Sequence, residues 1–224
     1  FLAVGFVRPH VPLVAPKKYF APYPLGKMAL PPKISGDQYD IPQNSGNRRT
    51  TANYQMDLNQ QKGTLRAYYA SVSFVDALVG KILTALEATG QRDNTIVIFT
   101  SDHGYHLGEH DMWQKVSIHE ESAKVPLIIC VPGKKPAVCH SLSELIDLYP
   151  TVSKLCGLKI PGNIQGKDIS GMLDDPALKV RDAALSSGKG RLLRTEKWAL
   201  LDYGKKGELY DMENDPKQYD NLFG

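Results

Sequence analysis

The chain has 224 residues, of which 42% are hydrophobic and 23% charged, and its formal net charge is +3 at pH 7. This composition is that of an ordinary globular protein with room for one large domain or one and a half. The small charge and the lack of a Lys/Arg block argue against nucleic-acid binding, and no apolar run reaches the roughly 18 residues that span a bilayer. The three cysteines are widely spaced and form no CxxC motif, which argues against a structural zinc site.

The chain begins with an apolar run, Phe1–Gly5, that predicts a buried strand without a polar start or a leader. We therefore expect an N-terminal portion to have been removed or to lie on another chain. Residues 7–50 are rich in proline and predict a long irregular loop, which in compact domains is often functional. Apolar residues recur at three- and four-residue steps from Thr64 to Thr89, with Gly90 behind them, and predict a helix.

Two apolar, β-branched segments at residues 95–101 and 125–131 predict buried strands, and Ser143–Leu155 predicts a helix with Ser143 as its N-cap. A helix followed by a strand, twice over, favours a parallel sheet with crossover helices. Beyond residue 180 the segments become short and are separated by turn residues, which predicts a small antiparallel sheet. The strands expected there are Arg191–Thr195, Lys197–Asp202 and Gly207–Tyr210.

Several residues that suit ester hydrolysis lie next to predicted strands. Asp102-His103 ends the strand at 95–101, and a carboxylate beside an imidazole can share a divalent cation. Lys115 precedes the next strand, and His10 follows the first. Taken singly, each has an ordinary explanation: an Asp that caps a turn, a solvated lysine, a histidine that bonds backbone. If the strands are parallel and aligned, all of these residues converge on one rim, where they could cleave a phosphate or sulfate ester.

Four segments resemble one family, the type I sulfatases of the alkaline phosphatase superfamily, and in particular the C-terminal half of its iduronate-2-sulfatase and choline-sulfatase-like branch. The longest segment is FTSDHGYHLGEHDMWQKVSIHEESAKVPL at Phe99–Leu127. The others are FLAVGFVRPH at Phe1–His10, SLSELIDLYPTVSKLCG from Ser141 to Gly157, and GELYD at Gly207–Asp211 with DP and NL behind it. The likeness runs nearly end to end.

The resemblance implies an α/β fold of the alkaline-phosphatase-like type. This fold would consist of a parallel-rich sheet with flanking helices, incomplete at the N-terminus, plus a small C-terminal antiparallel α+β subdomain. The C-terminal portion of the catalytic domain would occupy residues 1–180, and the small subdomain residues 181–224. The resemblance also favours a periplasmic, secreted or lysosomal location.

Residue by residue, the resemblance implies that Asp102 and His103 are the downstream pair of Ca²⁺ ligands. Lys115 would hold a sulfate oxygen, and His10 would lie at the sulfate near the leaving group. The loop behind the metal pair either contacts substrate or shapes the site. The candidates for substrate contact in that loop are Tyr105, His106 and His110.

The chain departs from the family in one essential respect. The Cys/Ser-x-Pro-x-Arg motif, whose first residue becomes formylglycine, is absent, and so are the upstream aspartates that complete the calcium site. The resemblance assigns these groups to the N-terminal half of the sulfatase domain, which we expect as a partner. We therefore expect the present chain to be inactive alone.

The expected function is hydrolysis of sulfuric esters. The substrate would be a sulfated saccharide, such as a 2-O-sulfated uronic acid, or a small sulfate ester such as choline sulfate. Phosphodiester or phosphonate monoester hydrolysis stays open, because such enzymes of the same superfamily would share the metal rim. A non-catalytic fragment that binds sulfated glycans and a purely structural half-domain stay open as well. We expect no nucleic-acid partner and no membrane-spanning segment.

Overall fold

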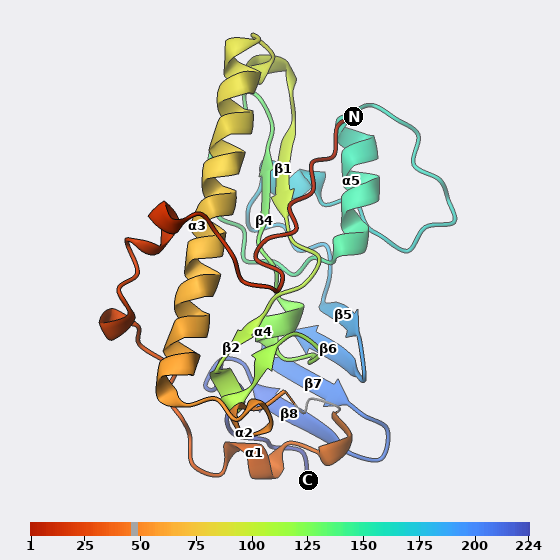
Figure 1. Cartoon of the computed structure of the whole chain (residues 1–224). Helices are drawn as coiled ribbons and strands as arrows, with labels where there is room; N and C mark the ends of the chain where they lie inside the picture. The colour runs from red at the N-terminus through yellow and green to blue at the C-terminus, as the bar shows by residue number, and fades with distance from the viewer. Residues whose placement is uncertain (46–48) are drawn as a thin grey trace. The chain divides into compact units, whose positions relative to one another are not determined.

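The computed structural model describes residues 1–45 and 49–224 (Figure 1). The chain divides into two compact units. Each unit is assembled from segments that lie apart in the sequence. The first consists of Phe1–Lys33, Arg48–Thr95 and His106–Gln114, and the second of Ile34–Asn47, Ile96–Tyr105 and Lys115–Gly224.

The first unit is built on one long helix, α3 (Leu58–Ala88). A capping box fixes its start: Asp57 Oδ1 accepts from the Gln60 amide at 2.8 Å, and Gln60 Oε1 accepts from the Asp57 amide at 2.8 Å. The predicted helix is confirmed, but it begins at Leu58 rather than Thr64 because this cap lies ahead of the apolar pattern. The shorter elements are η1 (Lys17–Phe20), η2 (Leu25–Lys27), α2 (Thr51–Tyr54), η4 (Arg92–Asn94), β2 (His106–Leu107), η5 (Glu109–Asp111) and β3 (Trp113–Gln114).

Aromatic side chains pack on α3 within this unit. The rings of Tyr19 and Phe74 lie 5.2 Å apart, and the Tyr23 hydroxyl lies 2.7 Å from Ser73 Oγ. The helix also holds an 18-residue window of mean hydropathy 1.4, of which 11% is buried, so by length and composition alone it could cross a membrane. It contains no unbroken apolar run of that length, because polar residues interrupt it. Core helices of globular proteins meet the same criterion, so one such helix is weak evidence for a span.

The second unit contains a pair of strands whose direction differs from the prediction. β1 (Val97–Thr100) pairs with β4 (Leu127–Cys130) in antiparallel register, with Val97 opposite Cys130. The parallel arrangement predicted for these strands is therefore wrong. The longest helix in the connection between them is α4 (Glu120–Ala123), whose four residues are too few for a crossover helix.

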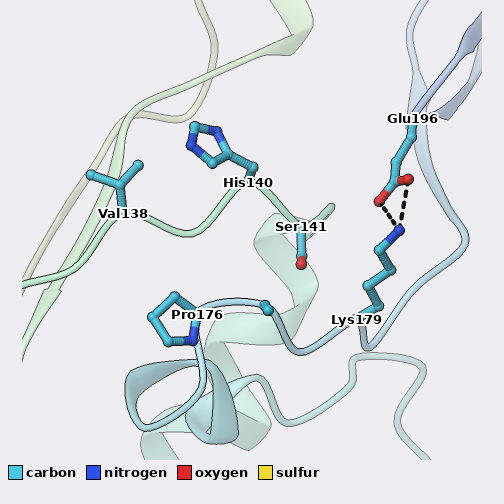
Figure 2. Close-up of a pocket in the computed structure, with 7 residues that line it drawn as sticks. Val138, His140, Ser141, Pro176, Lys179 and Glu196 are labelled. Carbon is cyan, nitrogen blue, oxygen red and sulfur yellow. Dashed lines mark hydrogen bonds and ion pairs between the residues drawn. The ribbon is translucent and has the colours of Figure 1, made fainter.

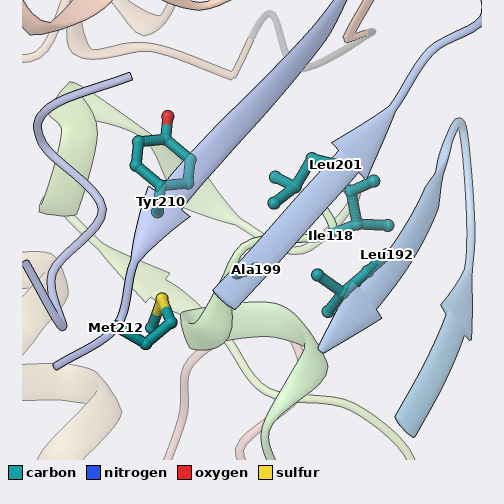
Figure 3. Close-up of a cluster of buried hydrophobic side chains, with 6 residues drawn as sticks. All are labelled: Ile118, Leu192, Ala199, Leu201, Tyr210 and Met212. Atoms are coloured by element: carbon teal, nitrogen blue, oxygen red, sulfur yellow. The ribbon is translucent and has the colours of Figure 1, made fainter. Parts of the chain in front are cut away.

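The four-stranded C-terminal sheet confirms the antiparallel prediction. Its strands follow one another in space as in sequence, and alternate residues on one face are buried. The strands are β5 (Ala183–Ser187), β6 (Arg191–Thr195), β7 (Trp198–Asp202) and β8 (Gly207–Asp211). The core on that face consists of Ile118, Leu192, Ala199, Leu201, Tyr210 and Met212 (Figure 3).

The N-terminal expectation is corrected. Phe1–Gly5 is irregular and exposed rather than a buried strand, since an apolar run forms a strand only when a neighbouring strand accepts its hydrogen bonds. The irregular loop predicted at 7–50 is confirmed for residues 7–45, which hold only single helical turns, while 46–48 lie outside the described residues.

The helix predicted at Ser143–Leu155 is present as a turn, η6 (Leu145–Asp147), followed by α5 (Leu148–Leu155). Its capping residue is Glu144, whose amide donates to Asp147 Oδ2 at 2.9 Å, and not Ser143. The remaining elements of the second unit are α1 (Asp37–Asp40), η3 (Gln43–Ser45) and η7 (Ser170–Leu173).

Candidate active site

The Asp102-His103 pair lies in a tight turn that directly follows β1 in the second unit. Ser101 Oγ donates to the carbonyl of His103 at 2.9 Å, and the Gly104 amide donates to the carbonyl of Ser122 at 2.8 Å. The turn is thus closed on itself by the serine and tied to α4 by the glycine.

The two side chains of the pair are arranged as neighbouring ligands. His103 Nδ1 lies 2.8 Å from the carbonyl of Gly104, so it carries the proton and leaves the Nε2 lone pair available. His103 Nε2 lies 3.6 Å from Asp102 Oδ2, and the Asp102 side chain is 86% exposed. Two atoms that each bind one Ca²⁺ at about 2.4 Å and at right angles are about 3.4 Å apart, so the pair fits adjacent positions on a cation. A backbone carbonyl that fixes the other nitrogen is the usual support for a ligating histidine.

Two side chains alone could supply only part of a metal shell. No group of three or more His, Cys, Asp or Glu side chains among the described residues is placed to hold a metal. Calcium takes about six to eight ligands, mostly oxygens, so a calcium ion at this pair would need further donors.

Gly104 is required by close packing. A Cβ added to it would lie 2.0 Å from the carbonyl oxygen of Glu121 and 3.2 Å from that of Lys124, both of which are backbone atoms of the α4 segment. Any side chain at residue 104 would therefore push α4 and the metal pair apart. This explains in physical terms why a glycine follows the Asp-His pair.

Lys115 lies in the second unit on a strained stretch of backbone. It precedes Val116, whose φ of +98° is a region that β-branched residues rarely adopt. Such strain tends to gather at functional sites. Lys115 is partly buried, and within the part of the chain that the structure describes its ammonium group has no hydrogen bond or ion pair.

His10 lies in the first unit, at the end of an exposed turn closed by its amide, which donates to the carbonyl of Val7 at 2.9 Å. Arg8 Nη1 donates to the His10 carbonyl at 2.9 Å, and His10 Nδ1 lies 2.7 Å from the Val11 carbonyl. With Nδ1 occupied, Nε2 is the nitrogen able to exchange a proton with a substrate. The convergence of His10 with the Asp102 turn stays a prediction.

The loop predicted to contact substrate is mostly buried. His106 and His110 belong to the first unit, are 0% and 1% exposed, and have ring centroids 6.2 Å apart. Glu109 accepts from the Leu107 amide at 2.6 Å and stiffens the turn between them. This burial favours a loop-shaping role for the two histidines. Tyr105 is partly buried and belongs to the second unit.

A shallow surface hollow in the second unit contains none of these residues (Figure 2). Its lining includes an exposed ion pair in which Lys179 Nζ lies 2.7 Å from Glu196 Oε1. His140, which the sequence leaves without a role, also lines it. Exposed ion pairs of this kind add little binding energy, so the hollow is not a candidate site.

Sequence reasoning missed one buried polar contact next to the candidate site. His119 bonds Glu208, which lies in the C-terminal strand β8. The one signal available was a glutamate at a core position of an otherwise alternating strand.

Two family models match the chain. The model described as Sulfatase covers residues 1–158, and the one described as N-sulphoglucosamine sulphohydrolase, C-terminal, covers residues 108–224.

Curated relatives match along the chain as well. A sulfatase of Formosa agariphila is 34% identical over 99% of this chain and 45% of its own length. The human iduronate 2-sulfatase is 32% identical over 72% of this chain and 36% of its own length. The chain thus spans about half the length, or less, of these relatives.

Solved structures share the fold. A phosphonate monoester hydrolase from Silicibacter pomeroyi superposes with a TM-score of 0.83 over 97% of this chain and 50% of its own, at 24% identity. A 2-O GAG sulfatase superposes with a TM-score of 0.75 over 87% of this chain and 48% of its own, at 26% identity. The expected alkaline-phosphatase-like fold is thereby confirmed, apart from the direction of β1 and β4.

Proposed function

Because the chain belongs to the sulfatase family of the alkaline phosphatase superfamily, we propose that the protein hydrolyses sulfuric esters with the aid of a calcium ion. The observation that carries the proposal is the local geometry of the metal pair. His103 presents Nε2 on the same side as the Asp102 carboxylate, 3.6 Å away, with Nδ1 fixed by the Gly104 carbonyl.

In this proposal, Asp102 and His103 bind the calcium ion, which when bound neutralises charge on the sulfate oxygens. Lys115 adds a second positive charge to those oxygens, and its ammonium group is not committed to an ion pair among the described residues. His10 donates a proton from Nε2 to the departing alkoxide, so that a poor leaving group leaves as an alcohol.

The nucleophile is proposed to lie outside these 224 residues, since none of the three cysteines stands in a Cys-x-Pro-x-Arg motif. A formylglycine would be supplied by the N-terminal half of the sulfatase domain, which would also complete the calcium shell. We accordingly expect no turnover from these residues alone. Within them, residues 1–180 are proposed to form the C-terminal portion of the catalytic domain and 181–224 a small subdomain that contains β5 to β8.

The proposed substrate is a sulfated saccharide, for instance a 2-O-sulfated uronic acid. Support comes from the likeness to the human iduronate 2-sulfatase and to the 2-O GAG sulfatase. Choline sulfate is the second candidate, since a choline-sulfatase of Rhizobium meliloti is 30% identical over 99% of this chain.

The test uses the protein encoded by the complete gene. Sulfate release from 4-nitrocatechol sulfate is measured with and without EDTA, and after addition of Ca²⁺, Mn²⁺ or Zn²⁺, because a mixed nitrogen and oxygen site can also take transition metals. Asp102→Ala should lower kcat/KM by more than about 100-fold. The matched control is Asp93→Ala, an exposed aspartate in η4, which should retain full activity.

Two outcomes would reject the proposal. Turnover that survives both EDTA and Asp102→Ala would remove the metal pair from the reaction. Faster hydrolysis of a phosphonate monoester than of any sulfate ester would favour the other hydrolase class that shares this fold. Equal sulfate release by the 224 residues alone would refute only the need for an external nucleophile.

A further inference from the structure

Helix α4 connects two parts of the second unit. On one side, the carbonyl of Ser122 accepts the amide of Gly104 at 2.8 Å, directly behind the metal pair. On the other side, Ile118, which precedes the helix, is part of the core on the C-terminal sheet (Figure 3). The helix is only four residues long, so its position depends on these contacts rather than on its own stability.

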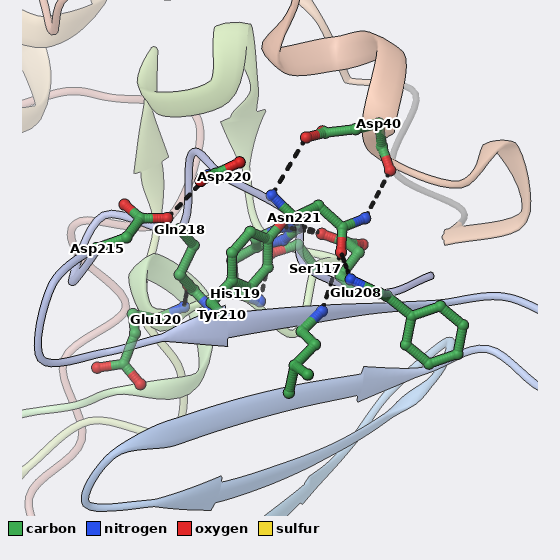
Figure 4. Close-up of polar contacts among 12 residues, drawn as sticks. Asp40, Ser117, His119, Glu120, Glu208, Tyr210, Asp215, Gln218, Asp220 and Asn221 are labelled. Atoms are coloured by element: carbon green, nitrogen blue, oxygen red, sulfur yellow. Dashed lines mark hydrogen bonds and ion pairs between the residues drawn. The ribbon is translucent and has the colours of Figure 1, made fainter.

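The polar contact between His119, the N-cap of α4, and strand β8 is fully buried. His119 Nε2 lies 2.8 Å from Glu208 Oε2, and the side chains are 1% and 0% exposed (Figure 4). The Tyr210 hydroxyl donates to the same oxygen at 2.6 Å. Glu208 stands opposite Leu201 on the buried face of the sheet, where an apolar residue is expected. The hydrogen bonds from His119 and Tyr210 explain why a carboxylate is tolerated at that position.

The charge state of Glu208 depends on these donors. Burial alone raises the pKa of Glu208, but the hydrogen bonds from His119, Tyr210 and Tyr203 outweigh it and hold the pKa below its usual range. Asp37 and Asp40 of α1 also act on this cluster, since their charges raise the pKa of Tyr210. A buried carboxylate that lost its histidine partner would keep its desolvation cost without compensation.

Two more contacts hold the start of α4 to C-terminal segments. Glu120 Oε1 accepts from Arg194 Nε of β6 at 3.0 Å. The Glu120 amide donates to Gln218 Oε1 at 2.8 Å (Figure 4). His119 is the N-cap of α4, directly before Glu120 and three residues before Ser122, whose carbonyl accepts the Gly104 amide.

We propose that the buried His119–Glu208 pair is a positioning pair, through which the C-terminal sheet holds α4 and thereby sets the geometry of the Asp102-His103 turn and of Lys115. The path is short. His119 lies three residues before the carbonyl that binds Gly104 and four residues after Lys115. The inference rests on the proposed sulfatase function for the roles of the metal pair and Lys115, but not for the mechanical coupling itself.

The test uses the protein encoded by the complete gene and three variants. His119→Leu removes the donor and leaves Glu208 buried without it. His119→Gln is the conservative variant, because its amide nitrogen can reach the place of Nε2. Arg181→Met is the matched control: it breaks a buried ion pair with Asp147 in the same unit that does not involve α4.

The main readout is amide hydrogen exchange without added metal, well below the unfolding temperature, because the Gly104 amide reports directly on its bond to Ser122. In His119→Leu, exchange at Gly104 and over residues 115–123 should rise by at least about tenfold. His119→Gln should restore most of the protection. Arg181→Met should lower Tm but leave exchange at Gly104 unchanged.

The second readout is catalytic. His119→Leu should weaken Ca²⁺ binding or lower kcat by about 10- to 100-fold, the range for groups that support metal ligands, with a smaller change in KM. Arg181→Met should keep wild-type values at the same temperature. If His119→Leu does not fold, Glu208→Leu carries the same readouts, because it removes the partner of His119 and places an apolar side chain opposite Leu201 on the buried face of the sheet.

Wild-type exchange at Gly104 in His119→Leu or Glu208→Leu, together with a lowered Tm, would overturn the proposal and leave the pair a purely structural contact. If the protein has no sulfatase activity but His119→Leu still raises amide exchange at Gly104, the proposed function is rejected and the coupling is retained. The two failures are therefore distinguishable.

Discussion

Arg181 forms a two-point contact with Asp147: Nε donates to Oδ2 at 2.8 Å, and Nη2 donates to Oδ1. Asp147 is fully buried, and Arg181 also pairs with Glu144 at 2.9 Å. Burial raises the pKa of Asp147, but the hydrogen bonds from Arg181 and from the Lys167 and Glu144 amides outweigh it and lower that pKa. This contact ties the start of α5 to the segment that leads into β5.

Asp147→Ala should destabilise the protein by about 3–5 kcal/mol, because it leaves the Arg181 charge buried without its main partner. Urea unfolding at pH 7 measures the change in free energy of unfolding. The control is Asp174→Asn, which breaks the exposed pair with Lys134 and should cost less than about 1 kcal/mol. Equal losses from the two variants would contradict the difference in burial.

Gly104→Ala should disrupt the metal turn, because the new Cβ would meet the carbonyl of Glu121. We expect a loss of about 1–3 kcal/mol in the free energy of unfolding, together with weaker Ca²⁺ binding by calorimetry. Gly80→Ala is the control, because nothing lies within 4 Å of a Cβ there in helix α3. It should stabilise the protein by about 0.5–1 kcal/mol. Unchanged calcium affinity in Gly104→Ala would show that α4 does not constrain the turn.

The lowered pKa of Glu208 predicts a specific dependence of stability on pH. A carboxyl whose pKa is lower in the folded state stabilises the fold above its unfolded pKa of about 4.3, and this stabilisation is lost as the pH falls through the folded value. Glu208→Gln should therefore be less stable than the wild type at pH 7, and the difference should shrink under acid. A difference in unfolding free energy that stays constant from pH 7 to pH 3 would contradict this assignment.

Tyr203 and Tyr210 should resist ionisation. Burial first, and then the Glu208 charge, raise the pKa of both phenols well above the usual range. A group with a raised pKa stabilises the fold below its unfolded pKa of about 10, and this stabilisation is lost as the pH rises toward the folded value. In an alkaline titration followed by ultraviolet absorbance, these two of the eleven tyrosines should ionise only on unfolding. Tyr210→Phe should remove one of them from that late step.

The sequence predicted local features well and distant pairings poorly. The helical pattern of α3 and the short segments between turn residues that form β6 to β8 depend on residues near each other in the chain, and both are confirmed. The direction of β1 and β4 depends on how the intervening segment folds, and its apolar pattern contains no information on that. The strand predicted at Phe1–Gly5 was wrong for the same reason. Composition indicates an apolar segment but not whether a neighbouring strand is available.

In the candidate site, too, local features could be predicted from the sequence and distant contacts could not. Asp102 and His103 are adjacent in the sequence, so their joint presence at a strand end could be predicted from the chain alone. The partner of His119 is Glu208, 89 residues further on, and no local pattern connects the two. The role of the glycine at 104 also required the structure, because the reason for it is the approach of α4 from another segment.

The bond between the Gly104 amide and the Ser122 carbonyl has a consequence for how such a protein can diversify. It joins the two ends of the segment between them, so the closure of this loop depends on that bond and on the contacts that hold α4, and not on the length of the rest of the segment. Lengthening a closed loop costs little, because the entropy of closure grows only slowly with the number of residues. Insertions ahead of Lys115, which leave His119 and α4 in place, could therefore lengthen this segment at little cost while the Asp102-His103 turn keeps its shape.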